Sequence, residues 1–346
     1  MSSIGSPTGA RAPRQIDVCN GDADGLCAVL QCRLDAPAAA ELITGLKRDI
    51  ALLDRVQAGT GDEVLVCDLS MQRNRAALLR LLAAGVRVRY FDHHMVRGVP
   101  CHPGLEAHLD FAPDACSSLL VDRHLHGRWR AWALVGAYGD NLRGVADAMA
   151  ASSGLDQAQR ERLRRLGEAI NYNAYGEDER DVAIAPSRLY PIMARYRNPL
   201  DFLDGETIVA RIDAERRADL DRARALRPHR DDAHAGVWLL PDAVWSRRVI
   251  GTFANDLAFE QPRRAHAVLR QTASGDFSVS VRAPRAAASG ASTLCARFGG
   301  TGRSAAAGIG HLPQDALGRF LDAFAAMRWG RARTRRQACA PDRTMR

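Results

Sequence analysis

The sequence predicts an α/β protein with an N-terminal parallel sheet and a second, smaller mixed α/β domain. In the first half of the chain, short apolar runs alternate with helical stretches, which is typical of a parallel sheet covered by helices on both faces. A second alternation of this kind begins near Gly236. Acidic or histidine clusters directly follow several of the apolar runs, and open α/β sheets bind ligands at the carboxyl ends of their strands.

The elements of the first half follow from apolar periodicity and from helix stop signals. Strands are expected at residues 16–19, 41–44, 63–67 and 86–91. Helices are expected at residues 26–34, 50–57, 75–84, 116–126 and 129–138. Gly85 ends the third of these helices, because glycine readily adopts the backbone conformation that follows a helix.

The second half begins with a polar stretch at residues 155–226, which is rich in Arg and Glu and is expected to be helical. Further elements are expected as strands at 237–240, 265–269 and 277–282, a helix at 250–259, a segment at 291–298, a glycine-rich turn at 299–302 and a small-residue helix from Ala305. The expected divisions are a disordered leader at 1–14, a first domain at 15–200, a helical connector at 201–230, a second domain at 231–327 and an Arg-rich tail at 328–346.

Composition places the chain among ordinary globular proteins. It has 346 residues, of which 47% are hydrophobic and 25% are charged, enough for two domains with cores of their own. No apolar run approaches the length that spans a bilayer, and the polar N-terminus lacks the apolar core of a secretory signal. We therefore expect a cytoplasmic protein without a membrane partner. The eight cysteines form no C-x-x-C pair and are expected to be reduced, buried side chains.

The net charge of +8 is concentrated at the C-terminus. Residues 328–346 contain seven Arg and one acid, Asp342, which together give +6. Such a tail could be an electrostatic arm for nucleic acid or a disordered tail without a partner. Lys47 is the only Lys of the chain, so the abundance of Arg indicates a coding bias and favours the second interpretation.

Asp22 and Asp24 follow the first predicted strand. Two carboxylates at this spacing point the same way in an extended segment, and they repel each other unless a cation lies between them. Gly21 and Gly25 would let the backbone turn tightly around such a cation. The alternative is an acidic turn in which an Asp caps the following helix.

Asp68 follows the third predicted strand, and Asp92, His93 and His94 close the fourth. Mixed carboxylate and imidazole ligands suit Mn²⁺, Fe²⁺ or Zn²⁺, and a carboxylate-rich site favours Mn²⁺ or Mg²⁺. Taken singly, Asp68 could cap the next helix, and the histidines could be a surface pair. Asp140 follows a predicted helix and by itself would be a helix-end turn.

Two features of the second half are typical of an anion site. Arg282 ends a predicted strand, and residues 299–304 form a glycine-rich loop that contains Arg303. Backbone N–H groups at the start of a helix bind phosphate, and Arg adds forked hydrogen bonds. The alternative is a tight packing turn.

In this order the motifs resemble those of the DHH phosphoesterase superfamily, which includes RecJ-like and nano-RNase-like enzymes. The matching residues are Asp22-Ala23-Asp24-Gly25, Asp68, Asp92-His93-His94 and Asp140, and in the second half Arg282 and Gly300 to Gly308. The second set is similar to the strand Arg and the glycine-rich motif of the DHH-associated C-terminal domain. The resemblance covers roughly residues 15–325.

The resemblance implies an active site in the cleft between the two domains, with two divalent metal ions, most often Mn²⁺ and alternatively Mg²⁺. The implied metal ligands are Asp22, Asp24, Asp68, His93 and Asp140. Asp68 would bridge both ions and, with Asp92 and His94, would form the catalytic set, in which Asp92 orients a histidine. The implied substrate-binding residues are His94, Arg282, Gly300, Gly302, Arg303 and Ser304.

The chain departs from the family pattern at two places. Val18 stands where many members have a histidine, and Asn20 replaces the first Asp of the RecJ-type motif, so Asn20 is a possible auxiliary oxygen ligand. Arg303 replaces the histidine of the glycine-rich motif. Arg binds phosphate but does not exchange protons near neutral pH, which leaves the substrate preference open.

The expected function is a Mn²⁺-dependent phosphodiesterase hydrolase that cleaves short oligonucleotides or small nucleotides through a metal-bridged hydroxide. Alternatives are a single-strand-specific 5′ exonuclease, a cyclic-dinucleotide or nucleotide phosphatase, and a nucleotide-binding protein without catalysis. The expected partner is a short nucleic acid or nucleotide substrate, and a homodimer is possible. RNA versus DNA, cleavage polarity and the role of the Arg-rich tail stay open.

Overall fold

A computed structural model describes residues 12–330 of the chain. Most of the predicted leader and most of the Arg-rich tail lie outside these residues. The chain forms two compact units: the first extends to Asp221 and includes residues 247–249, and the second comprises residues 222–246 and those from Ile250 onward. Each unit has its own sheet.

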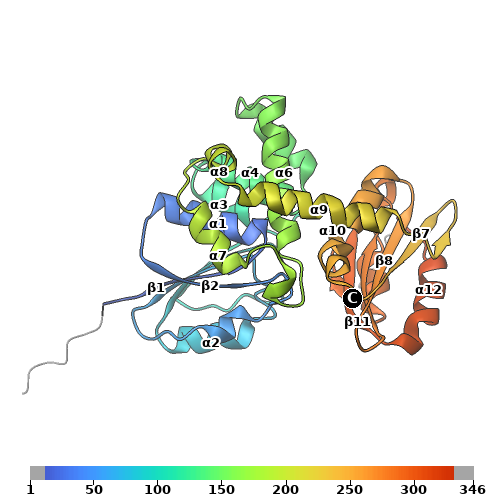
Figure 1. Ribbon diagram of the computed structural model, residues 1–346. Helices are drawn as coiled ribbons and strands as arrows, with labels where there is room; N and C mark the ends of the chain where they lie inside the picture. Colours follow the sequence, from blue (N-terminus) through green and yellow to red (C-terminus); the bar gives the residue numbers. More distant parts are fainter. Residues whose placement is uncertain (1–11, 331–346) are drawn as a thin grey trace, which may run out of the picture. The chain divides into compact units, whose positions relative to one another are not determined.

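The first unit is built on a five-stranded, wholly parallel sheet with the strand order β2-β1-β3-β4-β5. Its strands are β1 (Gln15–Asn20), β2 (Ala40–Gly45), β3 (Glu63–Cys67), β4 (Arg87–Asp92) and β5 (Leu105–Leu109). Figure 1 shows α2 (Arg75–Ala83) on one side of this sheet and α1 (Ala23–Asp35) on the other. The prediction of a parallel sheet with helices on both faces is therefore confirmed.

The remaining helices of the first unit follow the sheet in sequence. They are α3 (Ser117–His124), α4 (Arg130–Gly139), α5 (Arg143–Ser152), α6 (Gln157–Asn173), α7 (Pro186–Met193), α8 (Pro199–Gly205) and α9 (Ile208–Arg224), with a short 3-10 turn at Glu179–Asp181. The stretch 155–226 is thus helical, as its polar pattern predicts. The helix α9 runs past Asp221 into the second unit.

Packing under the sheet explains why α2 forms where it does. Leu78, Leu81 and Leu82 recur at helical spacing and are buried against the strand residues Val64 and Val88. The predicted helix at residues 50–57 was wrong in extent, because only Leu52–Arg55 forms a 3-10 turn. Its Leu52 and Leu53 still contribute to the core, so burial of these side chains needs one turn only.

The second unit holds a six-stranded mixed sheet with the order β10-β11-β9-β8-β7-β6. The strands are β6 (Arg230–Asp231), β7 (Ala235–Leu240), β8 (Ala265–Gln271), β9 (Phe277–Arg282), β10 (Thr301–Gly302) and β11 (Ala306–Leu312), and the helices are α10 (Val244–Glu260), α11 (Ala291–Ala296) and α12 (Leu317–Ala325). Only β7 and β8 pair in parallel. The predicted mixed α/β architecture is confirmed.

One element of the second unit contradicts the prediction from the sequence. The small residues after the glycine-rich turn form strand β11, not a helix. Ala306 and Ala307 pair with Arg282 and Val281 of β9, and Ile309, Leu312 and Ala307 enter the core with Phe320. Alternate burial of these side chains against α12 outweighs the helical preference of an Ala run.

No helix among residues 12–330 combines the length and the apolar character that a bilayer-spanning segment requires.

Candidate metal centre

Three neighbouring strands bring acidic side chains to one edge of the first sheet. Cys19 of β1 lies opposite Cys67 of β3, and Cys67 lies opposite Phe91 of β4. Asp68 and Asp92 therefore end adjacent strands. The chain places β2 on one side of β1 and β3 on the other, so the cluster lies at the topological switch point where such sheets bind ligands.

Asp22 and Asp24 occupy the start of α1. Asp22 caps this helix, since its Oδ1 accepts a hydrogen bond from the N–H of Gly25 at 3.1 Å. Asp24 accepts hydrogen bonds of 2.8 and 2.7 Å from the backbone N–H groups of Ser117 and Ser118, where α3 begins. Both carboxylates are buried. Asp22 therefore does cap the helix, as the alternative interpretation of the sequence predicts. Each carboxylate oxygen that accepts one hydrogen bond keeps a further lone pair, which can bind a cation.

The glycines around Asp22 are required by close packing. Neither Gly21 nor Gly25 has a positive φ, so neither position needs glycine for its backbone conformation. A Cβ on Gly25 would lie 2.2 Å from the carbonyl oxygen of Asn20, and one on Gly21 would lie 1.9 Å from that of Gly45. Small residues here let α1 begin directly against the end of the sheet.

Asp68 combines burial with an unfavourable backbone conformation. Its φ is +57°, a left-handed value that costs most L-residues roughly 1–2 kcal/mol. Asp68 is 4% exposed and does not cap α2, whose N-cap is Asn74. Burial, and then the charges of Asp22 and Asp24, raise the pKa of Asp68 well above its ordinary value. Strain and charge repulsion gathered at one residue indicate a functional role.

His93 lies at the centre of the cluster. Its Nε2 is 3.1 Å from Asp68 Oδ1 and 3.9 Å from Asp24 Oδ2, and its Nδ1 is 3.9 Å from Asp140 Oδ2. The carbonyl oxygen of Ala115 lies 2.9 Å from Nδ1, which indicates that this nitrogen is the N–H donor and directs Nε2 at the carboxylates. Burial acts to lower the pKa of His93, but the contact with Asp68 and the charges of Asp140 and Asp24 raise it to about 10.

Asp92 organises the loop that carries the two histidines. It is fully buried, and its Oδ1 accepts hydrogen bonds from the N–H groups of His93 and His94 and lies 2.7 Å from His94 Nδ1. Its Oδ2 accepts a hydrogen bond from the N–H of Met71. The contact of Nδ1 with Asp92 directs His94 Nε2 outward, and the His94 side chain is 46% exposed. This arrangement suits an orienting role for Asp92 and a ligand-facing role for His94.

Asp140 reaches the cluster through the packing of α4 on α6. It is the first residue after α4, and Gly139 and Gly167 let the two helices approach closely. A Cβ on Gly167 would lie 2.3 Å from the carbonyl oxygen of Val135 and 2.9 Å from the N of Gly139. The structure therefore brings together all five residues that the sequence singled out as metal ligands.

Sequence reasoning missed Lys47. Its ammonium forms an ion pair with Asp22 Oδ2 and a 3.2 Å hydrogen bond with Asn171 Oδ1, and it lies 5.6 Å from the centroid of the Tyr175 ring. Burial acts to lower the pKa of Lys47, but Asp22 and Tyr175 raise it well above its ordinary value. The available signal was composition, because this is the only Lys in the chain. Asn20 Oδ1 accepts a hydrogen bond from the N–H of Asp22 at 3.2 Å.

The donor set fits a divalent metal ion. Ligand atoms of Asp68, Asp92, His93 and His94 all lie within 4.8 Å of one another. Asp92 and His94 contact each other, whereas His93 faces Asp68 and the neighbouring Asp24, so these three residues could hold such an ion. Buried carboxylates that raise one another's pKa are stabilised by a bound cation, and Mn²⁺ or Mg²⁺ accepts such oxygen-rich sites.

In the second unit, Arg282 is held by protein groups. Its Nε donates to Asn255 Oδ1 at 2.6 Å, and its Nη1 donates to Ser280 Oγ and to the carbonyl oxygen of Val281, both at 3.0 Å. Its Nη2 is 3.4 Å from the carbonyl oxygen of Gly251. These contacts position the guanidinium on β9 beside α10, as expected for either a ligand contact or a structural anchor.

The glycine-rich loop is a tight hairpin between β10 and β11. Thr301 and Gly302 pair with Gly308 and Ala307, and the N–H of Arg303 donates to the carbonyl oxygen of Ala306 at 2.8 Å. Gly302 has a φ of 144°, which favours glycine. Gly300, Gly302, Arg303 and Ser304 thus lie in or next to a hairpin, so the helix predicted after this loop was wrong, whereas the anion-binding role of these residues stays a prediction. The hairpin still adjoins Arg282, because β11 pairs with β9.

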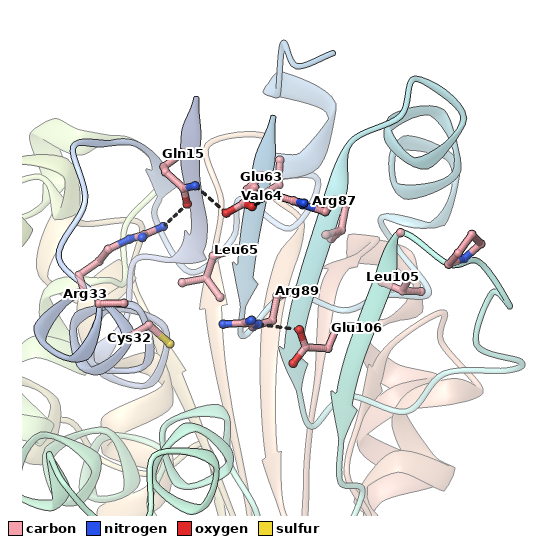
Figure 2. A pocket seen from close by; sticks show the side chains of 14 residues that line it. Gln15, Cys32, Arg33, Glu63, Val64, Leu65, Arg87, Arg89, Leu105 and Glu106 are labelled. Atoms are coloured by element: carbon pink, nitrogen blue, oxygen red, sulfur yellow. Dashed lines mark hydrogen bonds and ion pairs between the residues drawn. The ribbon is translucent and has the colours of Figure 1, made fainter. Parts of the chain in front are cut away.

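A separate pocket of about 260 Å³ lies at the amino ends of β1, β3, β4 and β5 (Figure 2). Its charged walls are neutralised within the protein, since Arg87 pairs with Glu63 and Arg89 with Glu106. It therefore lies away from the acidic cluster, which forms at the opposite, carboxyl ends of the strands. The acidic cluster, and not this pocket, is therefore the candidate metal centre.

No family model and no curated protein sequence matches the chain. Solved structures do resemble it. Exonuclease RecJ bound to manganese is 19% identical with a TM-score of 0.56, over 92% of this chain and 91% of that one. The DHH domain of a protein assigned to a ribosomal protein family is 14% identical with a TM-score of 0.61, over 90% and 86% of the two chains.

A third similar structure is the pGpG-specific phosphodiesterase PggH from Vibrio cholerae. It is 13% identical with a TM-score of 0.52, over 90% of this chain and 97% of that one. These likenesses extend over most of each protein and confirm the prediction from the motifs: the chain has the α/β DHH fold of RecJ-like proteins.

Proposed function

We propose that the chain is a divalent-metal-dependent phosphoesterase that acts on short oligonucleotides or small nucleotides, with Mn²⁺ as the preferred ion. The observation that carries this proposal is the buried acidic cluster around His93 at the switch point of the sheet. Two proteins with similar folds support the proposal: RecJ is an exonuclease whose structure was solved with manganese, and PggH is a phosphodiesterase.

Different residues of the cluster would have different roles in phosphate-ester hydrolysis. Asp24, Asp68, His93 and Asp140 would hold metal, with Asp22 at the edge of the same cluster. A bound divalent ion supplies Lewis acidity and lowers the pKa of water near it. Asp68, held in a strained backbone by the end of β3, keeps its carboxylate aimed at His93 without reorganisation. His93 must release its proton before it can bind metal.

His94 is the residue we assign to the substrate phosphate. Asp92 fixes its orientation through Nδ1, which leaves Nε2 to contact an ester oxygen from the exposed side of the cluster. Arg282 would hold a more remote phosphate, since Asn255 and Ser280 preset the direction of its guanidinium. Arg303 would add charge at the adjoining hairpin.

The substrate class follows from the charges of the cluster and from the similar folds. A buried cluster that could hold a divalent cation suits a phosphate ester as substrate. The likeness to PggH, which covers 97% of that phosphodiesterase, favours dinucleotides and other short substrates. Tyr172 is buried in the core, and its hydroxyl donates to Asp219.

The test is hydrolysis of 5′-labelled RNA and DNA from the dinucleotide upward, with Mn²⁺ or with EDTA. The panel includes cyclic dinucleotides and a nucleoside 3′,5′-bisphosphate. Metal-dependent turnover that is strongest on oligomers of two to five residues supports the proposal. Equal EDTA-resistant turnover in wild type and an Asp68→Asn variant would contradict it.

The likeness to RecJ favours one second candidate, a 5′-directed single-strand exonuclease. Long 5′-labelled strands would then release mononucleotides as efficiently as short ones. Deleting residues 331–346 and measuring the salt dependence of cleavage would show whether the Arg-rich tail holds such strands, because each phosphate contact steepens that dependence.

A further inference from the structure

Lys47 is a single exception in the composition of the chain. Of its 48 Lys and Arg residues, all are Arg except this one. A coding bias that replaces Lys by Arg elsewhere leaves one Lys, and this Lys contacts the acidic cluster. Arg carries the same charge in a wide planar fork, whereas Lys carries it as a compact point. At this position the chain carries the compact form of the charge.

The surroundings of Lys47 form a socket for this ammonium. The backbone N–H of Lys47 donates to the carbonyl oxygen of Ala174 at 2.9 Å, next to the end of α6. Its Nζ contacts Asp22 and Asn171, and the Tyr175 ring lies beside it. Only 29% of the side chain is exposed, so this is a placed cation and not a solvated surface Lys.

The ammonium takes the place at Asp22 that a second metal ion would need. Asp22 Oδ1 accepts the hydrogen bond that caps α1, and Oδ2 pairs with Lys47. On the β1 side, Val18 is buried and apolar, and the Asn20 amide oxygen is bonded to the N–H of Asp22. Neither residue offers a charged ligand.

We propose that Lys47 is a built-in cation that occupies the Asp22 side of the cluster, so that the protein binds one divalent ion, at Asp24, Asp68, His93 and Asp140. This inference rests on the proposed function for its metal and deepens it by assigning the number of ions. One ion together with an ammonium would then serve where two ions are expected from the family resemblance.

The test counts metal ions in the full chain. Wild type, Lys47→Met, Lys47→Arg and the control Arg48→Met are titrated with Mn²⁺ in a calorimeter, and the bound metal is measured after desalting. Arg48 is the exposed neighbour of Lys47 and loses the same charge without touching the cluster. Electron paramagnetic resonance separates an isolated Mn²⁺ from a spin-coupled pair.

We expect one Mn²⁺ per chain with an isolated-ion spectrum in wild type, Lys47→Arg and Arg48→Met. Lys47→Met should bind two ions and show a coupled pair. Two ions in wild type would overturn the proposal, and so would a single ion in a folded Lys47→Met. If Lys47→Met does not fold, the wild-type count alone still decides whether the site holds one ion.

Hydrolysis is measured on the same samples, so that the two proposals fail separately. Two bound ions with Mn²⁺-dependent turnover would refute the role of Lys47 and leave the phosphoesterase standing. One bound ion without turnover on any substrate of the panel would do the reverse.

Discussion

Asp68 shows how a single residue accepts an unfavourable conformation where chemistry requires it. Its left-handed backbone and its contact with two other buried carboxylates both destabilise the metal-free fold. An Asp that only caps a helix would need neither the left-handed backbone nor the neighbouring buried carboxylates. Such local conflict is typical of functional sites, where stability and activity oppose each other.

Asp68→Asn should therefore separate stability from activity. Asn tolerates a positive φ and can still accept a hydrogen bond from His93, so the backbone stays in place. We expect the free energy of unfolding of the metal-free variant to exceed that of wild type by on the order of 1 kcal/mol, because the substitution removes a charge that its neighbours repel. Metal-dependent hydrolysis should fall at least ~100-fold. Unchanged turnover at saturating Mn²⁺ would remove Asp68 from the mechanism.

His93 gives the metal-free protein a particular pH dependence. Its pKa rises from the ordinary 6.5 to about 10 in the folded state. The stability from its protonated form is complete below about pH 6.5 and is lost as pH rises toward 10. We expect the melting temperature of the EDTA-treated protein to fall over this range, and His93→Gln to flatten the fall.

Mn²⁺ should reverse this trend, since the ion binds deprotonated His93 and stabilises more at high pH. The exposed His311, replaced by Gln, serves as the control and should keep the wild-type slope. A pH-independent melting temperature in metal-free wild type would contradict the assignment.

Arg282 tests the role of the second unit. Arg282→Lys keeps the charge but loses the fork that Asn255 and Ser280 orient. If it holds a remote phosphate, KM should rise about 10-fold, equivalent to ~1.4 kcal/mol, with kcat nearly unchanged. Steady-state kinetics on a dinucleotide measures both. A loss confined to kcat would move Arg282 into the chemical step.

At the scale of elements, the crossing of α4 and α6 decides where Asp140 lies. A Cβ on Gly167 would lie 2.9 Å from the N of Gly139, and a Cβ on Gly139 would lie 3.0 Å from the carbonyl oxygen of Gly167. The backbone of α4 therefore approaches α6 closely, and the loop that follows α4 delivers Asp140 to His93. Helix packing thus brings to the cluster a proposed metal ligand that lies far in sequence from the strands.

Gly167→Ala should weaken both the fold and the metal site. The new methyl group would lie 2.3 Å from a backbone oxygen of α4, so we expect a loss of roughly 1–3 kcal/mol in unfolding free energy and weaker Mn²⁺ binding. Gly144→Ala in α5 is the matched control: a Cβ there meets nothing within 4 Å, and stability should rise by ~0.5–1 kcal/mol. Denaturant titration and calorimetry measure both effects, and equal behaviour of the two variants would refute the packing argument.

At the scale of the whole molecule, each unit has a core and a titrating group of its own. The proposed metal ligands all belong to the first unit. In the second unit, burial lowers the pKa of His266 to about 4, and its Nδ1 has no hydrogen-bond partner within residues 12–330. The units should therefore respond to different solution conditions.

Scanning calorimetry should resolve these responses. Mn²⁺ should increase the free energy of unfolding of the first unit by ~2.7 kcal/mol at a hundredfold excess over Kd, and so raise its transition temperature. Acid should lower the transition temperature of the second unit. His266 stays neutral in the folded unit but is protonated in the unfolded chain, so the unit loses stability as pH falls from about 6.5 to about 4. His266→Phe should remove the acid effect only. A Mn²⁺ shift in both transitions would contradict this division.

The sequence alone determined the fold class and indicated most of the residues that we propose as metal ligands. Apolar runs that end in Asp68 and Asp92 indicate parallel strands, and parallel strands collect their carboxyl ends at one edge. Asp22, Asp24, His93 and Asp140 could be placed with them because their motifs follow strand and helix ends in a known order.

Only the tertiary structure decided the features that depend on partners distant in sequence. Lys47 joins the cluster through contacts with Asp22 and Asn171, and no local pattern marks such a pairing. The residues from Ala306 form a strand because β9 and α12 bury them, although a run of small residues favours a helix. Local patterns report propensity and periodicity, whereas long-range burial and charge pairing select among the conformations that they permit.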